Sequence, residues 1–273
     1  MNHIDRAFQE LRAEGHAAFI PFLTAGDPDP DTTARIVLAA GEAGADVVEL
    51  GFPFSDPIAD GPTIQNSYTR ALARGQRSED VFRLVESVRP QSEIPIVAMI
   101  SYSLVFRMGF DRFLDRACRA GLDGATIPDL PVEEMGRMRA AAEERGFHLI
   151  CFATPATTPA RRSMIVSAAA GFIYYIAVRG ITGEREALPQ DLVQNIRALK
   201  ALTEVPVAVG FGISKPAHAR AVAQVADGVI VGSALVRRIH EASEQGEDRV
   251  NAAVGFIREM ARAVKGGRPA HKR

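Results

Sequence analysis

The sequence predicts a single α/β domain of the (β/α)8 barrel class, a TIM barrel with an extra N-terminal helix, and three observations support this. Eight short apolar segments alternate with helical patterns along the chain, as in parallel strands joined by helices. No linker or change of composition separates two domains. The length of 273 residues is near that of a typical barrel, which favours it over a doubly wound open sheet.

Composition excludes several classes of function. With 47% hydrophobic residues, 24% charged residues and a net charge of -1, the chain has no global charge that would favour nucleic acid or an anionic membrane. No apolar run approaches the roughly 20 residues of a membrane helix. Cys118 and Cys151 lie in a helical and a strand pattern, which is typical of free thiols in a reducing compartment. We therefore expect a cytoplasmic protein with no nucleic-acid or membrane partner.

The first part of the chain begins with an amphipathic helix, because Ile4, Phe8 and Leu11 recur at helical spacing. Short apolar runs bounded by turn-forming residues predict the strands, and prolines near the starts of helical patterns predict helix entries. The elements expected up to the third strand are a strand at 17–23, a helix at 30–43, a strand at 45–50, a helix opened by Gly61-Pro62, a helix at 78–88 and a strand at 95–100.

The second part continues the same alternation. The expected elements are a helix at 109–120, a strand at 124–127, a helix at 132–145, a strand at 148–153, a helix at 159–169, a strand at 172–178, a helix at 189–202, a strand at 205–209, a helix at 215–225, a strand at 228–231 and closing helices to about 264. Residues 1–265 are thus predicted to form the catalytic barrel. Residues 266–273 are predicted to be a disordered tail.

Two carboxylates mark the end of the second strand. Alternation along 45–50 turns Glu49 inward, where a carboxylate is costly to bury unless a partner or a reaction uses it. Asp60 follows in the loop. The structural alternatives are that a distant arginine neutralises Glu49 and that Asp60 caps the next helix. We expect both acids to face one pocket, the arrangement that proton-transfer chemistry needs.

Glycine-containing loops follow the last two strands. Gly210-Phe-Gly212 follows the seventh and Gly232-Ser233 the eighth, where barrels commonly bind phosphate through backbone N–H groups and a helix N-terminus. Gly183, after the sixth strand, can supply another N–H. Tight turns alone would also explain these glycines, but two such loops on adjacent strands favour a phosphate site.

The loop 179–188 carries glycines and charged residues, which is typical of a lid that closes over bound substrate. An ordinary solvated loop is the alternative. Tyr174, on the strand before it, is either a core residue or lies at the pocket edge, because a buried phenol needs a hydrogen-bond partner.

Two absences narrow the chemistry. None of the four lysines lies in a predicted strand, so a Schiff-base aldolase would lack its nucleophile. The six histidines show no metal-binding spacing, and we expect no metal. Carbon–carbon cleavage in this barrel would depend on acid and base groups.

Two segments closely resemble the tryptophan synthase alpha subunit family. They are Phe19-Ile-Pro-Phe-Leu-Thr-Ala-Gly-Asp-Pro28 and Glu49-Leu-Gly-Phe-Pro-Phe-Ser-Asp-Pro-Ile-Ala-Asp-Gly-Pro-Thr-Ile-Gln65. Shorter matches follow in the expected order at Pro128-Asp-Leu-Pro131, Gly180-Ile-Thr-Gly183, Gly210-Phe-Gly-Ile-Ser214 and Gly232-Ser233. The resemblance spans roughly residues 1–265.

The resemblance implies a lyase that cleaves indole-3-glycerol phosphate to indole and D-glyceraldehyde 3-phosphate in L-tryptophan biosynthesis. It implies that Glu49 is the main acid and base, which protonates indole C3 and helps to take the proton from the glycerol hydroxyl. It also implies that Asp60 hydrogen-bonds the indole N–H and stabilises positive charge that develops in the ring.

The same resemblance assigns the other site residues. The phosphate cradle would comprise Gly183, Phe211, Gly212, Gly232 and Ser233. Phe22 and Ile100 would flank the indole ring, Tyr174 would line the site near Glu49, and Thr182 would meet Asp60 when the lid closes.

The family also implies a partner. This is the tryptophan synthase beta subunit, which binds pyridoxal phosphate, joins indole to serine and forms an alpha2beta2 complex. Nothing in this chain resembles a pyridoxal phosphate site, so we expect no cofactor here. The alpha subunit would dock through its barrel rim, including Phe54-Ser-Asp56, and pass indole through a tunnel.

The chain departs from the family pattern at three positions. Ser103 replaces a common asparagine, Thr126 a common aliphatic pocket residue, and Arg179 a smaller residue. Both carboxylates and the phosphate loops are intact. Two rival functions stay open on this evidence: a phosphosugar isomerase or other phosphate-binding barrel enzyme, and a barrel that only supports a beta subunit.

Overall fold

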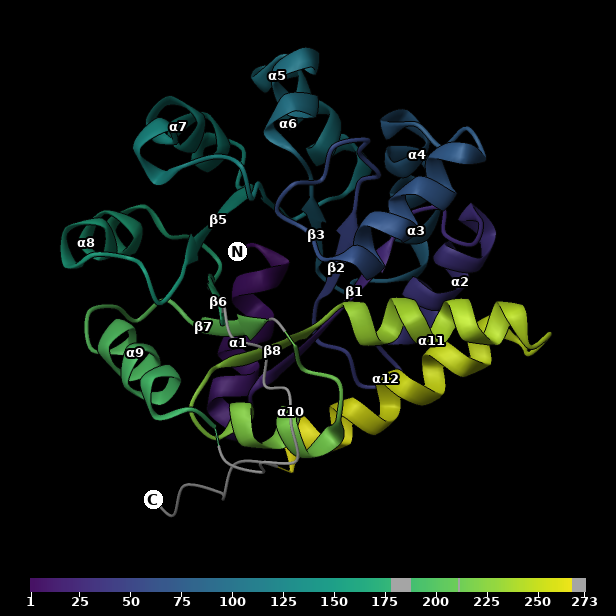
Figure 1. Ribbon diagram of the computed structural model, residues 1–273. Coiled ribbons are helices and arrows are strands. Elements are labelled where there is room, and N and C mark those ends of the chain that lie inside the picture. Colours follow the sequence, from purple (N-terminus) through teal and green to yellow (C-terminus); the bar gives the residue numbers. More distant parts are fainter. Residues whose placement is uncertain (178–187, 211, 267–273) are drawn as a thin grey trace.

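The strands of the protein close into a barrel in the order in which they occur in the chain (Figure 1). The structure is a computed structural model, and it describes residues 1–177, 188–210 and 212–266. The strands are β1 (Ala18–Thr24), β2 (Val48–Gly51), β3 (Ile96–Met99), β4 (Gly124–Thr126), β5 (His148–Ala153), β6 (Ile173–Ile176), β7 (Val207–Gly210) and β8 (Gly228–Val231). All are parallel, and β8 pairs with β1. The predicted (β/α)8 fold is confirmed.

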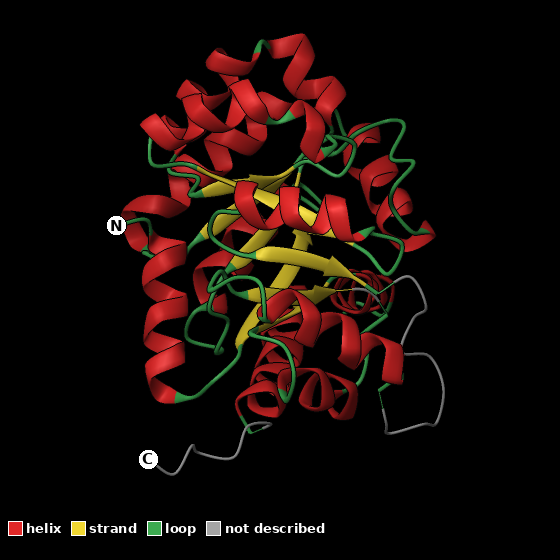
Figure 2. Ribbon diagram, turned by 90° about the vertical axis from the view of Figure 1, so that its left-hand side faces the viewer, coloured by secondary structure: helices red, strands yellow, loops and turns green. Residues whose placement is uncertain are grey.

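Helices surround the barrel, as Figure 2 shows from the side. They are α1 (His3–Glu14), α2 (Pro30–Ala40), α3 (Pro62–Ala73), α4 (Ser78–Val88), α5 (Tyr102–Met108), α6 (Phe110–Ala120), α7 (Gly136–Glu144), α8 (Pro159–Ala168), α9 (Gln190–Lys200), α10 (Pro216–Ala223), α11 (Ser233–Glu244) and α12 (Arg249–Lys265), with short 3-10 helices η1 (Arg89–Gln91) and η2 (Val132–Glu134). Proline opens several of them, for example Pro30 behind the N-cap Asp29, whose side chain accepts from the Thr32 amide.

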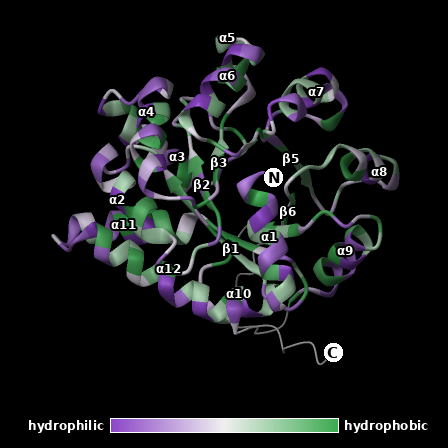
Figure 3. Ribbon diagram, turned by 180° about the vertical axis from the view of Figure 1, so that it is seen from behind, coloured by the Kyte–Doolittle hydropathy of each residue, from purple (hydrophilic) through white to green (hydrophobic). Residues whose placement is uncertain are grey.

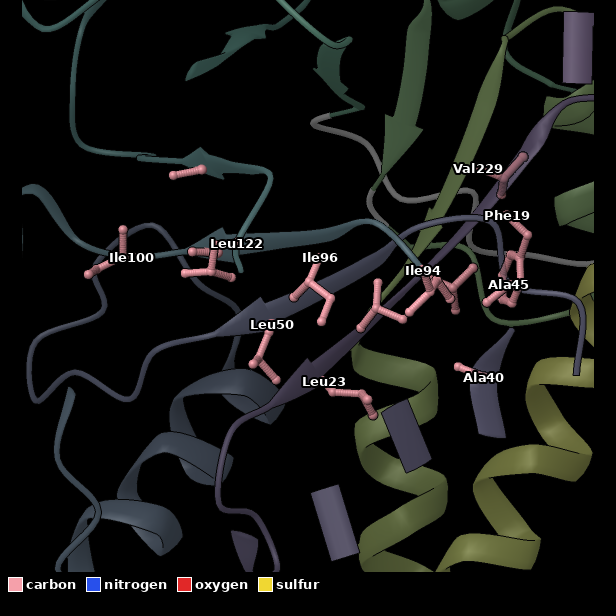
Figure 4. Packing of buried hydrophobic residues seen from close by; sticks show 14 of the residues in the cluster. Phe19, Leu23, Ala40, Ala45, Leu50, Ile94, Ile96, Ile100, Leu122 and Val229 are labelled. Carbon is pink, nitrogen blue, oxygen red and sulfur yellow. The ribbon is translucent and has the colours of Figure 1, made fainter. Parts of the chain in front are cut away.

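Each strand divides its side chains between two cores. Leu50 and Ile96 point outward and pack against the helices (Figure 4), while Val47 and Val97 point into the barrel. This alternation is what a parallel strand buried on both faces requires.

Helix α1 closes the N-terminal end of the barrel, where it is seen from behind in Figure 3. Its buried residues Ile4, Phe8 and Leu11 join the interior cluster, and the ring of Phe8 lies 5.7 Å from that of Phe172. The predicted amphipathic helix is therefore a plug for the barrel, which leaves the opposite end to carry the chemistry.

Two local differences from the expected elements have simple causes. Helix α5 was not predicted, because it is short and buries only Val105, so it carries no apolar periodicity; Ser101 caps its start. The helix expected over 132–145 divides into η2 and α7 at Met135, whose backbone stays in the right-handed helical region.

Both cysteines are free thiols, as predicted. Burial raises the pKa of the Cys151 thiol to about 11, which makes it unreactive at neutral pH. Within the described ranges, none of the helices has the length and apolar character needed to cross a bilayer.

Candidate active site

A cavity of about 360 Å³ opens where the strands end. It brings together these residues predicted from the sequence: Phe22, Glu49, Asp60, Tyr174, Gly212, Gly232 and Ser233. They come from β1, β2, β6, the loops after β2 and β7, and the start of α11. The cavity thus joins both carboxylates to the two glycine loops, at the end of the barrel where such enzymes place their chemistry.

Glu49 is buried in the barrel, as its strand position predicted. Its side chain is 2% exposed, and its Oε1 accepts a hydrogen bond of 2.9 Å from the Thr126 hydroxyl. Burial raises the pKa of Glu49 to about 8; the negative charge of Asp60 also raises it, and the Thr126 hydrogen bond opposes both. No lysine or arginine of the described residues pairs with this carboxyl. Glu49 is therefore protonated at neutral pH. The buried carboxyl is neutral because it carries a proton, and not because an arginine pairs with it.

Asp60 lies in the loop after β2 and does not cap α3. The N-cap of α3 is Gly61, which makes no side-chain cap, while Gln65 Nε2 donates to the backbone oxygen of Asp60 over 2.8 Å. Burial raises the pKa of Asp60 to about 6, and the negative charge of Asp129 contributes. At neutral pH the site thus pairs a protonated Glu49 with an ionised Asp60, the separation of pKa values that acid and base roles require.

Two tyrosine hydroxyls approach the carboxylates. Tyr174 lies on β6 and Tyr68 on α3, and burial together with the charges of Glu49 and Asp60 raises the pKa of both phenols. Glycines leave room for them: a β carbon at Gly51 would lie 2.7 Å from the Tyr68 oxygen, and one at Gly210 would lie 2.5 Å from the Tyr174 oxygen. Both phenols therefore keep their protons at neutral pH and can donate hydrogen bonds. Tyr68 was not predicted from the sequence as a site residue, because it lies on a helix and not at a strand end or in a loop.

The other end of the cavity has the features of an anion site. Gly212 has a φ of 75°, a conformation that glycine adopts without strain. Ser233 is the first residue of α11, behind its N-cap Gly232, so backbone N–H groups of the helix start are available to a ligand. Arg237 also lines the cavity. Sequence reasoning missed it, although it follows Ser233 by one helical turn and so shares its face.

Three predicted site residues, Thr182, Gly183 and Phe211, lie outside the described residues, as do the predicted lid over most of 179–188 and the tail beyond residue 266. The structure gives no position for them, so their roles stay predictions.

Ile100 is placed differently from the other predicted residues. It packs in the outer core (Figure 4) and lines a neighbouring cavity of about 30 Å³ together with Asp60 and Asp129. Met99 instead faces the main cavity beside Phe22. The reason is the pleat of β3, which turns consecutive side chains to opposite faces. The role predicted for Ile100 at the side of the ring therefore stays a prediction. By its position in the main cavity, Met99 fits that role better.

The chain is similar to known proteins over most of its length. The model of the family "Tryptophan synthase alpha chain" matches residues 8–265. The tryptophan synthase alpha chain of Rhodopirellula baltica is 46% identical over 261 residues, which cover 93% of this chain and 94% of that protein.

Solved structures give the same result. Tryptophan synthase subunit alpha from Legionella pneumophila superposes with a TM-score of 0.91 at 36% identity, covering 97% of this chain and 99% of that one. A chain from the tryptophan synthase α2β2 complex of Pyrococcus furiosus superposes with a TM-score of 0.82 at 39% identity, covering 93% and 98% of the two chains. This protein belongs to the tryptophan synthase alpha chain family.

Proposed function

We propose that Glu49 and Asp60 are the catalytic pair of this enzyme. As a member of its family, the chain is a lyase of tryptophan biosynthesis that catalyses the alpha reaction, the cleavage of indole-3-glycerol phosphate to indole and D-glyceraldehyde 3-phosphate. The observation that carries the assignment is a fully buried carboxylic acid, Glu49, whose pKa of about 8 keeps its proton available at neutral pH.

The reaction begins with the proton of Glu49. Glu49 gives this proton to C3 of the indole ring, and the positive charge that appears on the ring nitrogen is stabilised by ionised Asp60. Asp60 accepts the hydrogen bond of the ring N–H in this scheme. Its own pKa of about 6 keeps it negative at neutral pH.

Carbon–carbon cleavage then returns the proton. The Glu49 carboxylate takes the proton of the glycerol hydroxyl, the C–O bond becomes a carbonyl, and the electron pair of the breaking C–C bond returns to the ring as neutral indole. One proton has moved from the hydroxyl to C3, and Glu49 is protonated again. This cycle requires no cofactor, and we propose that the chain uses none.

The shape of the cavity suits the two ends of the substrate. Phe22, Met99 and Ile64 form an apolar cluster beside the carboxylates, which suits the faces of an indole ring. The phosphate would bind at Gly212, Gly232 and Ser233, where the start of α11 and the guanidinium of Arg237 favour an anion.

We also propose that the chain works with a tryptophan synthase beta subunit, which would hold the pyridoxal phosphate. The support is the similarity to a chain of the Pyrococcus furiosus α2β2 complex. The exposed side chain of Ile58, which is 88% exposed in the loop after β2 at the rim of the site, offers apolar surface for such docking. A cytoplasmic location is proposed on the two free thiols.

An indole-release assay, run with and without a beta subunit across a range of pH, tests this function. We expect indole to be released, with the rate rising as Asp60 ionises near pH 6 and falling as Glu49 loses its proton near pH 8. Isomerisation of a phosphosugar without indole release, or no turnover with the beta subunit present, would refute the proposal.

A further inference from the structure

We propose that Thr126 is the positioning residue of Glu49: its hydroxyl fixes one carboxyl oxygen, so that the other faces the substrate. This inference rests on the proposed catalytic role of Glu49 and adds a residue that does not itself touch substrate. Thr126 is fully buried, whereas Glu49 lines the cavity.

The two residues meet inside the barrel across an intervening strand. Glu49 lies in the middle of β2 and Thr126 ends β4, with β3 between them. The Thr126 hydroxyl lies 2.9 Å from Glu49 Oε1. Within the described residues, no donor contacts Oε2. The carboxyl group is therefore held by one oxygen and free at the other, which is the oxygen that can exchange a proton with the substrate.

The hydroxyl has a second acceptor, the backbone oxygen of Ala98 at 3.3 Å. A threonine hydroxyl has a single proton, so it cannot serve both acceptors fully at once. When Glu49 is ionised, the proton points to Oε1, because a charged acceptor makes the stronger bond. When Glu49 carries its proton on the free Oε2, Oε1 is the carbonyl oxygen and can still accept from the hydroxyl, which can otherwise turn towards Ala98. Thr126 thus provides a partner for both forms of Glu49.

The ionised form of Glu49 is the one that most needs a hydrogen-bond donor. Groups facing Glu49 from other elements are Asp60 in the loop after β2, Tyr68 on α3 and Tyr174 on β6; burial and the charge of Asp60 both oppose its ionisation. Arg237 lines the same cavity from α11. Each catalytic cycle nevertheless passes through the Glu49 carboxylate, and Thr126 is the donor that stabilises it.

The experiment compares Thr126→Val, which removes the hydroxyl at nearly constant shape, with Thr126→Ser, which keeps it, both in the complex with a beta subunit. We expect the valine variant to lose kcat with little change in KM. The alkaline limb of its pH profile should move to higher pH by roughly one to two units, because the Glu49 carboxylate loses a hydrogen bond that stabilises its charge. In the serine variant, the rate should fall at the same alkaline pH as in the wild type. Coincidence of the valine and wild-type profiles, or equal shifts for valine and serine, would overturn the role.

A second measurement does not depend on turnover. The infrared carbonyl band of the protonated Glu49 carboxyl, identified as the band that Glu49→Gln removes, should titrate at higher pH in Thr126→Val than in the wild type, and Thr126→Ala should behave in the same way. An unshifted band refutes the proposal for Thr126. Absence of indole release by the wild type would refute the proposed function, while the infrared titration would still decide the part played by Thr126.

Discussion

The two ends of the barrel interior are built from the same strands but differ in chemistry. At the N-terminal end, Val47, Val97 and Phe172 form an apolar cluster that α1 closes with Phe8. Val47 directly precedes β2, and Glu49 follows it by two residues, so both side chains point into the barrel interior. The same short stretch of chain thus carries an apolar side chain at the closed end and an acid at the open end, and what covers it differs: helix α1 at one end and a cavity at the other.

The fold tolerates the acid because the sealed end contributes apolar burial. The open end can then hold a carboxyl group whose charge is opposed by its surroundings. Fold stability and catalysis should therefore respond separately to substitutions at the two ends.

The largest effect is expected from Glu49→Gln at the open end. The substitution keeps the size of the side chain but removes its titratable proton, so indole release should fall by ~10²–10⁴ or more. Circular dichroism should show an unchanged fold. A suitable control is Glu79→Gln on the exposed surface of α4, which pairs with Arg116 and should leave the rate unchanged. A near-normal rate for Glu49→Gln would remove Glu49 from the mechanism.

The opposite result is expected at the sealed end for Phe8→Ala. Phe8 is 6% exposed and packs on Phe172, so its loss should lower the free energy of unfolding by about 3–5 kcal/mol. The kcat of the folded enzyme should change little. Phe106→Ala is the matched control, because Phe106 is 74% exposed and should cost less than about 0.5 kcal/mol. Equal losses of stability would contradict the sealing role of α1.

A smaller effect should follow from Ser233→Asp at the anion end. A carboxylate at the first position of α11 complements the helix dipole, so the fold should be retained, but it would repel the phosphate. We expect KM to rise at least tenfold, about 1.4 kcal/mol, with the rate at saturation less affected. Ser78→Asp, at the first position of α4, makes the same change at a helix start away from the cavity and should leave KM unaltered. An unchanged KM for Ser233→Asp would remove Ser233 from the phosphate site.

Much of this arrangement could be predicted from the sequence, because parallel strands follow a strict alternation. Burial of Glu49 and the barrel itself follow from that rule. The rule becomes less useful at the end of a strand: Ile100, one residue beyond β3 and predicted to flank the indole, lines the small neighbouring cavity, while Met99 lines the main one.

Contacts between distant elements could not be predicted in this way. Tyr68 reaches the site from α3 and Arg237 from α11. Both lie within helical patterns, so nothing in the local sequence marks them as site residues. Thr126 was recognised as unusual in its family, but only the closed barrel shows that its hydroxyl meets Glu49.

If Glu49 is buried as a protonated acid, the free energy of unfolding must depend on pH, and denaturant unfolding at several pH values measures this dependence. The folded pKa of about 8 lies above the ordinary value of 4.5, so the contribution of Glu49 to stability is fully present below pH 4.5 and is lost as pH rises to about 8. Relative to Glu49→Gln, the wild type should therefore lose stability across this window and no further above it. A constant difference in unfolding free energy between the two proteins from pH 4 to pH 9 would show that Glu49 is not buried as a protonated acid.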